Sequence, residues 1–358
     1  MEQREYWYWL ASLELLGPAV LRRLLALLGS PEAVFREKKL PITDIQMQEV
    51  EKSKAKLPRL LDEFHTLEEK GLHWCCETDA EYPQRLRPLR DAPLGLFYKG
   101  ALPSEFVPTA GIVGARRCTS YGESMADLFG YELAQAGVQV ISGMALGVDG
   151  YAQKGAVRGG GRSFAVLGTG ADVCYPESNR RLYRDLEASG GILSELPPGS
   201  PGLPFHFPLR NRIISALSDI LLVIEAGVKS GSLITVDQAL EQGKEVMALP
   251  GRISDPLSQG CNRLIREGAG ILTSPEDVLA FFGRGAAPES RPERLPEGKA
   301  ALSETQKRIF AFLSSTPMHI EELAVRSGLG LGEISVQLME MEAAGAVRPV
   351  SSGYYIKK

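Results

Sequence analysis

Residues that build disulfides and metal centres are scarce in this sequence. Five cysteines and four histidines are spread over 358 residues. The cysteines form no C-x-x-C pair and are odd in number, so neither a disulfide framework nor a structural zinc site is predicted. The adjacent Cys75 and Cys76 are the pair that a redox role would use, but we interpret them as small apolar residues at a domain seam. No metal or cofactor is expected.

Long apolar runs are also lacking. The run Ile220–Ile224 stops at Glu225, far short of the roughly 20 residues that a membrane-spanning helix needs. The first residues carry acidic side chains and no small-residue cleavage site, which fits neither a secretory signal nor a transit peptide. A cytoplasmic protein is therefore expected.

An excess of positive charge is the third feature that is missing. The chain has 40 lysines and arginines against 44 acidic residues, a formal net charge of −4. The isoelectric point is about 5.8, and no segment of the chain is strongly basic. Binding to nucleic acid or another polyanion would therefore need a local positive patch.

Short apolar runs that alternate with helical patterns fill the central part of the chain. This alternation predicts a doubly wound, mainly parallel sheet with helices on both faces, which is an α/β fold of Rossmann-like type. The apolar runs are residues 111–114, 138–141, 163–167, 191–193, 220–224 and 245–249, and the helical patterns are 122–136, 148–157, 180–188 and 232–242.

Glycine-rich turns follow several of the predicted strands. Because ligands of open α/β sheets bind where parallel strands end, these turns should meet at one edge of the sheet. One glycine loop is weak evidence, whereas four at one edge predict a phosphate-binding crevice. The turns are Gly114–Arg116, Ser142–Gly147, Gly168–Gly170 and Ala226–Gly231.

The richest stretch is Phe205–Leu240. Its Ser230-Gly231-Ser232 turn lies between a strand and a helix, where backbone N–H groups bind anions. Arg210 and Arg212 flank Asn211 at a predicted helix start, and guanidinium groups bind phosphate oxygens in bidentate fashion. Phosphate contact is favoured for Arg210, while Arg212 has an equal alternative as a salt bridge to Glu225.

Aromatic and acidic residues near these turns have two interpretations each. Phe205 and Phe207 either stack on exposed bases or pack in the core. Asp149 and Glu225 are carboxylates that would repel phosphate, so we expect them to cap turns or orient an arginine. Arg116 is expected to point into the crevice and Arg117 to face elsewhere. An arginine cluster at Arg180, Arg181 and Arg184 is more typical of a solvated surface.

The flanks of the central segment (residues 81–283) differ in composition. Residues 1–80 read as short helices, with helical spacing over 10–28 and 52–70. An extended proline-rich connector follows and ends in a short predicted strand over 94–98. Residues 284–300 contain glycine, proline and charge without an apolar face and are predicted to be a linker. Residues 301–358 show three short helices and a hairpin, the winged-helix pattern, but the third helix has no lysine or arginine. We favour protein contact or autoregulation for that domain.

An ordered series of motifs resembles the DNA-processing protein A family, also called DprA or Smf. The likeness is dense over about residues 80–283. It is carried by Tyr82-Pro83, Gly114–Arg116, Ser142–Asp149, Val166–Gly170, Tyr175-Pro176, Ser194-Glu195, Phe207–Ile214, Glu225-Ala226, Ser230–Thr235, Pro250-Gly251 and Gly268-Ala269. The departures are Ala152-Gln153, where the family often has Ala-His, and Ser215-Ala216, where Ala-Gly is usual.

The resemblance implies a non-enzymatic cytoplasmic protein that binds and protects single-stranded DNA. It also implies loading of the RecA recombinase during natural transformation, a homodimer built through the Rossmann-like domain, and a SAM-like N-terminal helical domain. The DNA-binding residues predicted from the motifs and turns are Arg116, Ser142, Gly143, Gly147, Gly168, Phe207, Arg210, Asn211, Arg212, Ser230, Gly231, Ser232 and Thr235.

Two other classes of function are weighed against this one. A nucleotide-binding or nucleotide-cleaving Rossmann-like enzyme would need a Walker lysine or a catalytic glutamate after its glycine loop, and Ala239 stands where that carboxylate is expected. A transcription regulator would rest on the winged helix, whose acidic third helix argues against it.

Overall fold

The computed structural model describes residues 1–13, 15–284, 302–314, 317–351 and 353–357. The chain divides into two compact units, Met1–Gly285 and Ala286–Lys358. The predicted linker therefore lies outside the described residues except for Arg284. None of the described helices combines the length and the apolar character needed to cross a bilayer.

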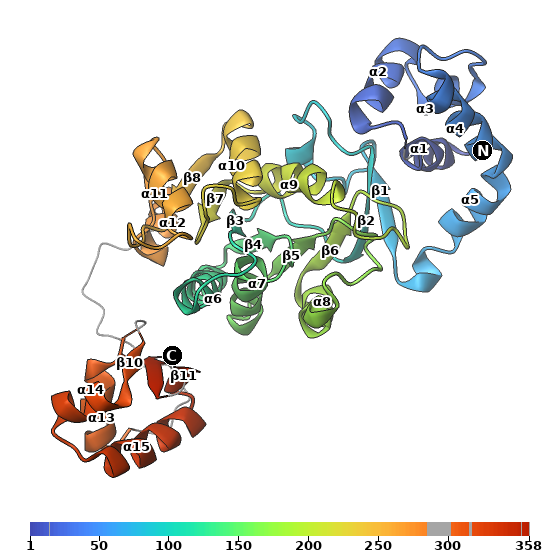
Figure 1. Cartoon of the computed structure of the whole chain (residues 1–358). Helices are drawn as coiled ribbons and strands as arrows, with labels where there is room; N and C mark the ends of the chain where they lie inside the picture. Colours follow the sequence, from blue (N-terminus) through green and yellow to red (C-terminus); the bar gives the residue numbers. More distant parts are fainter. Residues whose placement is uncertain (14, 285–301, 315–316, 352, 358) are drawn as a thin grey trace. The chain divides into compact units, whose positions relative to one another are not determined.

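A nine-stranded sheet organises the first unit (Figure 1). Its strand order is β1-β2-β6-β5-β4-β3-β7-β8-β9, and the seven strands from β6 to β9 run parallel. The strands are β1 (His73–Cys76), β2 (Gly95–Gly100), β3 (Thr109–Val113), β4 (Gln139–Ser142), β5 (Ser163–Val166), β6 (Gly191–Ser194), β7 (Ile220–Val223), β8 (Glu245–Ala248) and β9 (Gly270–Ile271). Strands β3 to β7 are buried along their whole length, as expected for strands covered on both faces.

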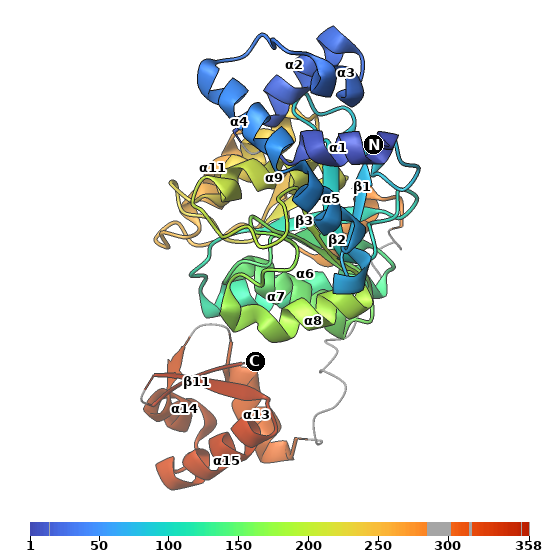
Figure 2. The ribbon, with the colours of Figure 1, turned by 90° about the vertical axis from the view of Figure 1, so that its right-hand side faces the viewer.

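Helices cover both faces of the sheet (Figures 1 and 2). Three apolar cores lie between the sheet and these helices. One core joins the sheet to α6 (Ser120–Gln135), α7 (Val148–Arg158) and α12 (Pro275–Phe281), with α8 (Arg180–Ser189) packed beside α7. A second joins it to α9 (His206–Leu217), α10 (Ser232–Glu241) and α11 (Gln259–Arg266), and a third joins it to α8 and to the helices that precede β1. The Rossmann-like α/β prediction is therefore confirmed.

The N-terminal helices pack against the edge of the sheet that β1 and β2 form. They are α1 (Gln3–Ala11), α2 (Pro18–Leu28), α3 (Pro31–Arg36), α4 (Asp44–Ala55) and α5 (Leu57–His65), followed by the short turns η1 (Glu68–Lys70) and η2 (Gln84–Leu86). Tyr8 of α1 lies 5.3 Å from Trp74 of β1 and 5.8 Å from Phe97 of β2, measured between ring centres. Aromatic packing thus joins the helices to the sheet.

Two details of the N-terminal prediction were wrong. Residues 73–76 fall in the segment predicted to be helical, yet they form β1, which pairs antiparallel with β2. The helix predicted over 52–70 is divided among the end of α4, α5 and η1, because Pro58 begins a new helix. A four-residue strand with the sequence His-Trp-Cys-Cys is too short to show a period of its own.

The second unit is a winged helix, as predicted. It contains α13 (Glu304–Phe312), α14 (Ile320–Ser327) and α15 (Leu331–Ala343), with a small sheet of β10 (Met318–His319), β12 (Tyr354–Lys357) and β11 (Val347–Ser351). Its core is separate from those of the first unit and is centred on Ile309, Leu323, Ile334, Leu338 and Met341, all fully buried.

Candidate nucleic-acid interface

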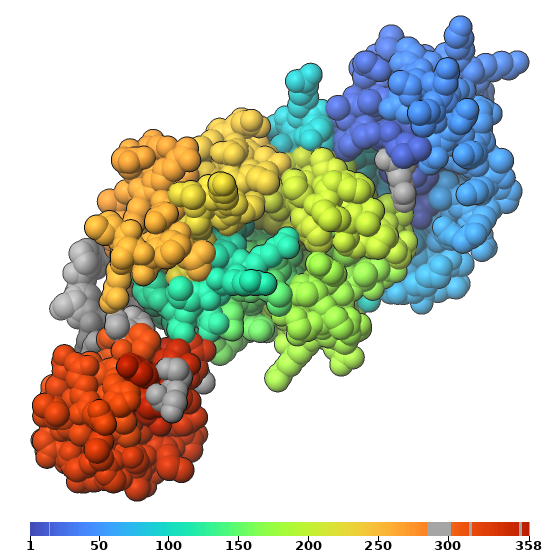
Figure 3. All heavy atoms as spheres, viewed as in Figure 1, coloured from blue at the N-terminus to red at the C-terminus, as the bar shows by residue number. Residues whose placement is uncertain are grey.

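The sheet reverses its strand order at β3. The chain runs outward from β3 through β4, β5 and β6, then returns to place β7 on the other side of β3. Ligands of open α/β sheets bind at such a switch point, beyond the carboxyl ends of the strands. A cavity of about 870 Å³ lies there, lined chiefly by the loops after β3 and β7 and by the start of α9. Figure 3 shows these two loop regions, teal and yellow, next to each other on the visible face.

The loop after β3 presents two arginines to the cavity. Ala115 N–H donates to the carbonyl of Glu225, which ties the loop to β7. The Glu225 carboxylate accepts hydrogen bonds from the backbone N–H and hydroxyl of Thr119, the residue before α6. Glu225 is thus a capping residue, as expected from the sequence. Arg116 and Arg117 are exposed on this anchored loop, and no carboxylate among the described residues pairs with them.

The loop after β7 presents backbone donors and a lysine. Ala226 N–H donates to the carbonyl of Leu257, which fixes the start of the loop. The Ser230 and Ser232 hydroxyl oxygens lie 2.7 Å apart at the start of α10. Within the described residues, no hydrogen bond takes up the backbone N–H of Gly231 or Ser232. The positive end of the helix dipole and these free donors make this turn suited to an anion.

Charge in the cavity is opposite in sign to that of the whole chain. Its lining contains four cationic side chains (Arg116, Arg117, Arg210 and Lys229) and one carboxylate (Asp149). The local excess is three positive charges, whereas the chain carries a net charge of −4. A confined positive patch on an acidic protein concentrates the electrostatic attraction for phosphate at one place.

Arg210 lines the cavity, but its guanidinium is buried and hydrogen-bonded to backbone carbonyls. Its side chain is 6% exposed, and Nη1 donates to the carbonyls of Gly143, at 2.9 Å, and Val166. Burial lowers the pKa of Arg210 to about 10 and raises the pKa of Asp149, its acidic neighbour. Arg210 Nε is buried and has no hydrogen-bond partner in the described part of the chain. The residue therefore braces the ends of β4 and β5 and offers little free charge to a ligand.

Arg212 lies on another side of α9 and does not line the cavity. It is 4% exposed and forms ion pairs with Asp91 and Glu195, both at 2.9 Å. The salt-bridge interpretation of the sequence was thus right, but the predicted partner, Glu225, was wrong. Helix α9 begins at His206, so the two arginines occupy its second turn rather than its start. Residues two apart on a helix point in different directions, which separates their roles.

The polar groups of the turn after β4 form hydrogen bonds within the protein. The Ser142 hydroxyl donates to the carbonyl of Ile112, and Gly143 N–H donates to Asp149 at 3.1 Å. Met144 has a positive φ of 52°, and Gln153 accepts a hydrogen bond from its N–H. Gln153, which replaces the family's frequent histidine, therefore has a positioning role. The donors of Ser142 and Gly143 are used internally, contrary to the expectation that they meet phosphate.

Gly147 and Gly168 allow close approach of neighbouring segments. Gly147 has φ +74°, and a Cβ there would lie 2.3 Å from the carbonyl oxygen of Ala115. A Cβ on Gly168 would lie 2.8 Å from the Phe207 ring. These glycines let neighbouring loops pack at the site, which any larger residue would push apart.

An aromatic group lies beside the cations. Phe207 packs against Tyr175 with ring centres 5.4 Å apart, and the Arg116 guanidinium lies 5.1 Å from the centre of the Phe207 ring. Tyr175 is 45% exposed and Phe205 is 61% exposed, so both offer ring surface to solvent. Flat apolar surfaces next to cations are what exposed nucleobases bind.

The cavity brings together most of the predicted residues and adds others. Its lining includes the predicted Arg116, Phe207, Arg210, Asn211, Ser230, Gly231, Ser232 and Thr235, and a smaller adjoining hollow includes Gly143 and Gly168. The predictions missed Tyr175, Lys229 and Gln259, and the expectation that Arg117 faces elsewhere was wrong, because it lines the cavity. Lys229 directly precedes the Ser-Gly-Ser turn, and Tyr175 belongs to a Tyr-Pro motif. Either motif could have predicted that its residue lies at the cavity.

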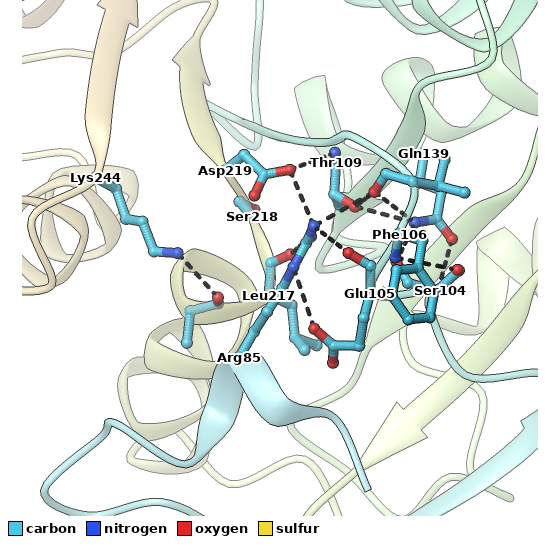
Figure 4. Close-up of polar contacts among 12 residues, drawn as sticks. Arg85, Ser104, Glu105, Phe106, Thr109, Gln139, Leu217, Ser218, Asp219 and Lys244 are labelled. Atoms are coloured by element: carbon cyan, nitrogen blue, oxygen red, sulfur yellow. Dashed lines mark hydrogen bonds and ion pairs between the residues drawn. The ribbon is translucent and has the colours of Figure 1, made fainter. Parts of the chain in front are cut away.

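At the opposite, amino ends of β3 and β7, charged groups pair with each other (Figure 4). Arg85 forms ion pairs with Asp219 at 3.2 Å and Glu105 at 3.5 Å, and it donates to the carbonyl of Leu217. Asp219 also accepts from the N–H of Thr109 at 2.8 Å. Lys244 donates to the carbonyl of Ala216, and burial lowers its pKa. The charged groups named at this edge of the sheet are therefore paired within the protein.

Two family models match different parts of this chain. The family described as DNA recombination-mediator protein A matches residues 73–283, and the DprA winged helix domain matches residues 293–353. Protein Smf of Escherichia coli is 39% identical over 293 residues, covering 80% of this chain and 78% of that protein. DNA processing protein DprA of Streptococcus pneumoniae is 45% identical over 201 residues, covering 56% of this chain and 71% of that protein.

Solved structures agree. The structure of DprA from S. pneumoniae superposes with a TM-score of 0.68 and 36% identity, covering 78% of this chain and 98% of that one. A structure of DNA processing protein A from Helicobacter pylori, described for its single-stranded DNA binding mode, has a TM-score of 0.54 and 27% identity, covering 60% and 96%. The sheet, the winged helix and these matches together show that this chain belongs to the DNA recombination-mediator protein A (DprA/Smf) family.

Proposed function

We propose that the switch-point cavity binds the backbone of single-stranded DNA. The observation that carries this proposal is a group of three cations, Arg116, Arg117 and Lys229, beside the backbone N–H groups of Gly231 and Ser232. Among the residues that the structure describes, no carboxylate pairs with these cations and no hydrogen bond takes up these N–H groups. Cations and backbone donors are the groups that hold phosphate oxygens in protein–DNA complexes. The H. pylori relative, which is described as binding single-stranded DNA, supports the same ligand class.

Single strands suit this site better than duplex DNA. Tyr175 and Phe207 lie at the cavity with ring surface toward the ligand space. Stacking on an aromatic side chain contributes about 1–3 kcal/mol per base, and only an unpaired strand can splay its bases to reach it. The aromatic pair therefore gives the site a preference that phosphate contacts alone would not provide.

The proposed role is binding without catalysis. Asp149 is the one carboxylate among the residues that line the cavity, and it accepts from Gly143 N–H beside the Arg210 guanidinium. A carboxylate fixed in this way is a brace for the loop. A general base needs access to the proton that it removes, so nucleotide cleavage has no support from this geometry.

Two further parts of the proposal follow the family. We propose that the bound strand is protected and passed to the RecA recombinase during natural transformation in the cytoplasm, with the chain acting as a homodimer through its Rossmann-like domain. Strand β9 is the edge of the sheet in that domain, and Ile271 on it is 55% exposed. An unpaired edge with an exposed apolar residue is a typical association surface.

The test is fluorescence anisotropy with single-stranded and duplex oligonucleotides of one sequence, titrated across a range of salt concentrations. We expect single strands to bind at least tenfold tighter than duplex and affinity to fall as salt rises, because phosphate contacts release counterions. Equal affinity for both forms would refute the proposed site. A nucleotide-hydrolysis assay runs in parallel, and turnover would favour the enzyme alternative. Sedimentation and a RecA binding assay test the homodimer and the partner.

A further inference from the structure

Helix α15 of the winged helix has two apolar faces. Ile334, Leu338 and Met341 are fully buried and form the core of the domain. On the outer face, Val336 is 53% exposed and Met339 is 67% exposed. A helix that needed only to pack on its own domain would carry polar residues on the outer face.

The outer face has the spacing of a coiled-coil seam. Residues Gly332, Val336, Met339 and Ala343 are separated by four, three and four positions, and all four are exposed. This is the alternation of a and d positions in a heptad repeat, which lets one helix pack along another. The small residues at both ends of the seam would allow close approach of a second backbone.

The charges beside the seam are of one sign. With Val336 and Ala343 at a and with Gly332 and Met339 at d, Glu333 and Glu340 fall at e and Glu342 falls at g. All three are exposed, and no lysine, arginine or histidine among the described residues forms an ion pair with them. Glu340 also accepts a hydrogen bond from the Gln306 side chain of α13 at 2.9 Å and keeps its charge. Residues at e and g select the partner of a coiled coil through interhelical ion pairs.

These charges decide among the possible occupants of the face. A second copy of α15 would place glutamates against glutamates or against Ser335 in either orientation, and like charges oppose pairing. Duplex DNA, the usual ligand of this position in a winged helix, would bring phosphates toward three carboxylates. A helix with basic residues beside its own apolar seam is complementary in both charge and spacing.

We propose that the outer face of α15 is a docking surface for an amphipathic helix of a partner protein, with apolar a and d positions flanked by lysine or arginine. Apolar contact with Val336 and Met339 supplies the affinity, and the three glutamates supply the selectivity. This mode is helix-to-helix recognition through anchors spaced three and four residues apart. It gives the winged helix a function in protein contact that does not depend on the DNA site in the first unit.

The test uses the full chain and two designed helical peptides of three heptads. Both have leucine at a and d, and one has lysine but the other glutamate at e and g. We expect the lysine peptide to bind at least tenfold tighter at low salt, because three ion pairs replace three repulsions. Isothermal titration calorimetry gives both affinities. Equal affinities would overturn the proposal.

Three variants keep the test decisive. Glu333→Lys/Glu340→Lys/Glu342→Lys should reverse the preference to the glutamate peptide, whereas Glu321→Lys, an exposed site on α14, should leave it unchanged. Val336→Ser/Met339→Ser should weaken the lysine peptide at least tenfold while the thermal unfolding midpoint stays constant, since both side chains are already exposed. If the parent chain self-associates or binds duplex DNA and this serine variant does not, the face belongs to another occupant and the proposal is wrong.

Discussion

The two ends of strands β3 and β7 carry cations that behave differently. At the amino ends, Arg85 lies between Asp219 and Glu105 and forms ion pairs with both (Figure 4). At the carboxyl ends, Arg116 and Lys229 have no ion pair with any carboxylate among the described residues. We call the amino ends of these strands, where the cation is ion-paired, the closed end. We call the carboxyl ends, where the cations have no ion pair within the described residues, the open end. Whether a cation is available to a ligand or serves the fold depends on whether the fold brings a carboxylate to it.

The largest effect is expected from reversing charge at the open end. Arg116→Glu/Lys229→Glu should lower the affinity for single-stranded DNA about 100-fold at low salt, since two charge-assisted phosphate contacts contribute about 3 kcal/mol together. Anisotropy measures the affinity, and thermal unfolding should be unchanged. The matched control is Lys38→Glu/Lys39→Glu, which makes the same change in net charge on exposed residues near α3. A similar loss in that control would show that net charge, and not the site, controls binding.

A change at the closed end should act on stability instead. Arg85→Leu removes the shared partner of Asp219 and Glu105 and should cost about 2 kcal/mol of unfolding free energy, less than for a fully buried pair because both acids are partly exposed. Urea denaturation gives this value. The affinity of the folded variant for single-stranded DNA should stay within twofold of the parent. If affinity fell as much as stability, the two ends would not be independent.

A smaller effect is expected at the start of α10. Ser232→Ala removes one hydroxyl next to the free N–H groups but leaves the backbone in place, so affinity should fall about threefold to fivefold, the value of one hydrogen bond. Ser258→Ala serves as a comparison because Ser258 is buried at the start of α11 and does not line the cavity. No change in Ser232→Ala would mean that DNA does not reach this turn.

The smallest effect on the open end should come from removing the second unit. Deletion of residues 286–358 should change single-strand affinity by less than twofold, because the first unit has its own cores and contains the whole cavity. A large loss would place part of the DNA site in the winged helix. The same deletion should abolish binding of the lysine peptide, which separates the two proposed surfaces.

Much of the fold followed from patterns in the chain. Short apolar runs and intervening helical periods predicted the parallel sheet, and glycine turns predicted which edge carries the site. Arg116, Phe207 and the Ser230–Ser232 turn were placed correctly at the cavity. Strands β1 and β9 were not predicted, because runs of four and two residues are too short to show a period.

The roles of individual polar residues were harder to predict. Arg210 and Arg212 look equivalent in sequence, yet one braces strand ends beside Asp149 and the other pairs with Asp91 and Glu195. Their partners come from segments as far as 121 residues away. Periodicity gives the direction of a side chain relative to its own helix but does not identify the segment that meets it.

The sequence by itself determined the order of strands and helices, the winged helix at the C-terminal end, and the glycine turns that approach a ligand. These features depend on local periodicity and on backbone conformations that are written in neighbouring residues. The tertiary structure alone decided which donors and charges remain free. Whether Ser142, Gly143, Arg212 or Lys229 can meet a phosphate depends on distant groups that the fold either brings to them or keeps away, since a buried polar group binds the nearest partner available.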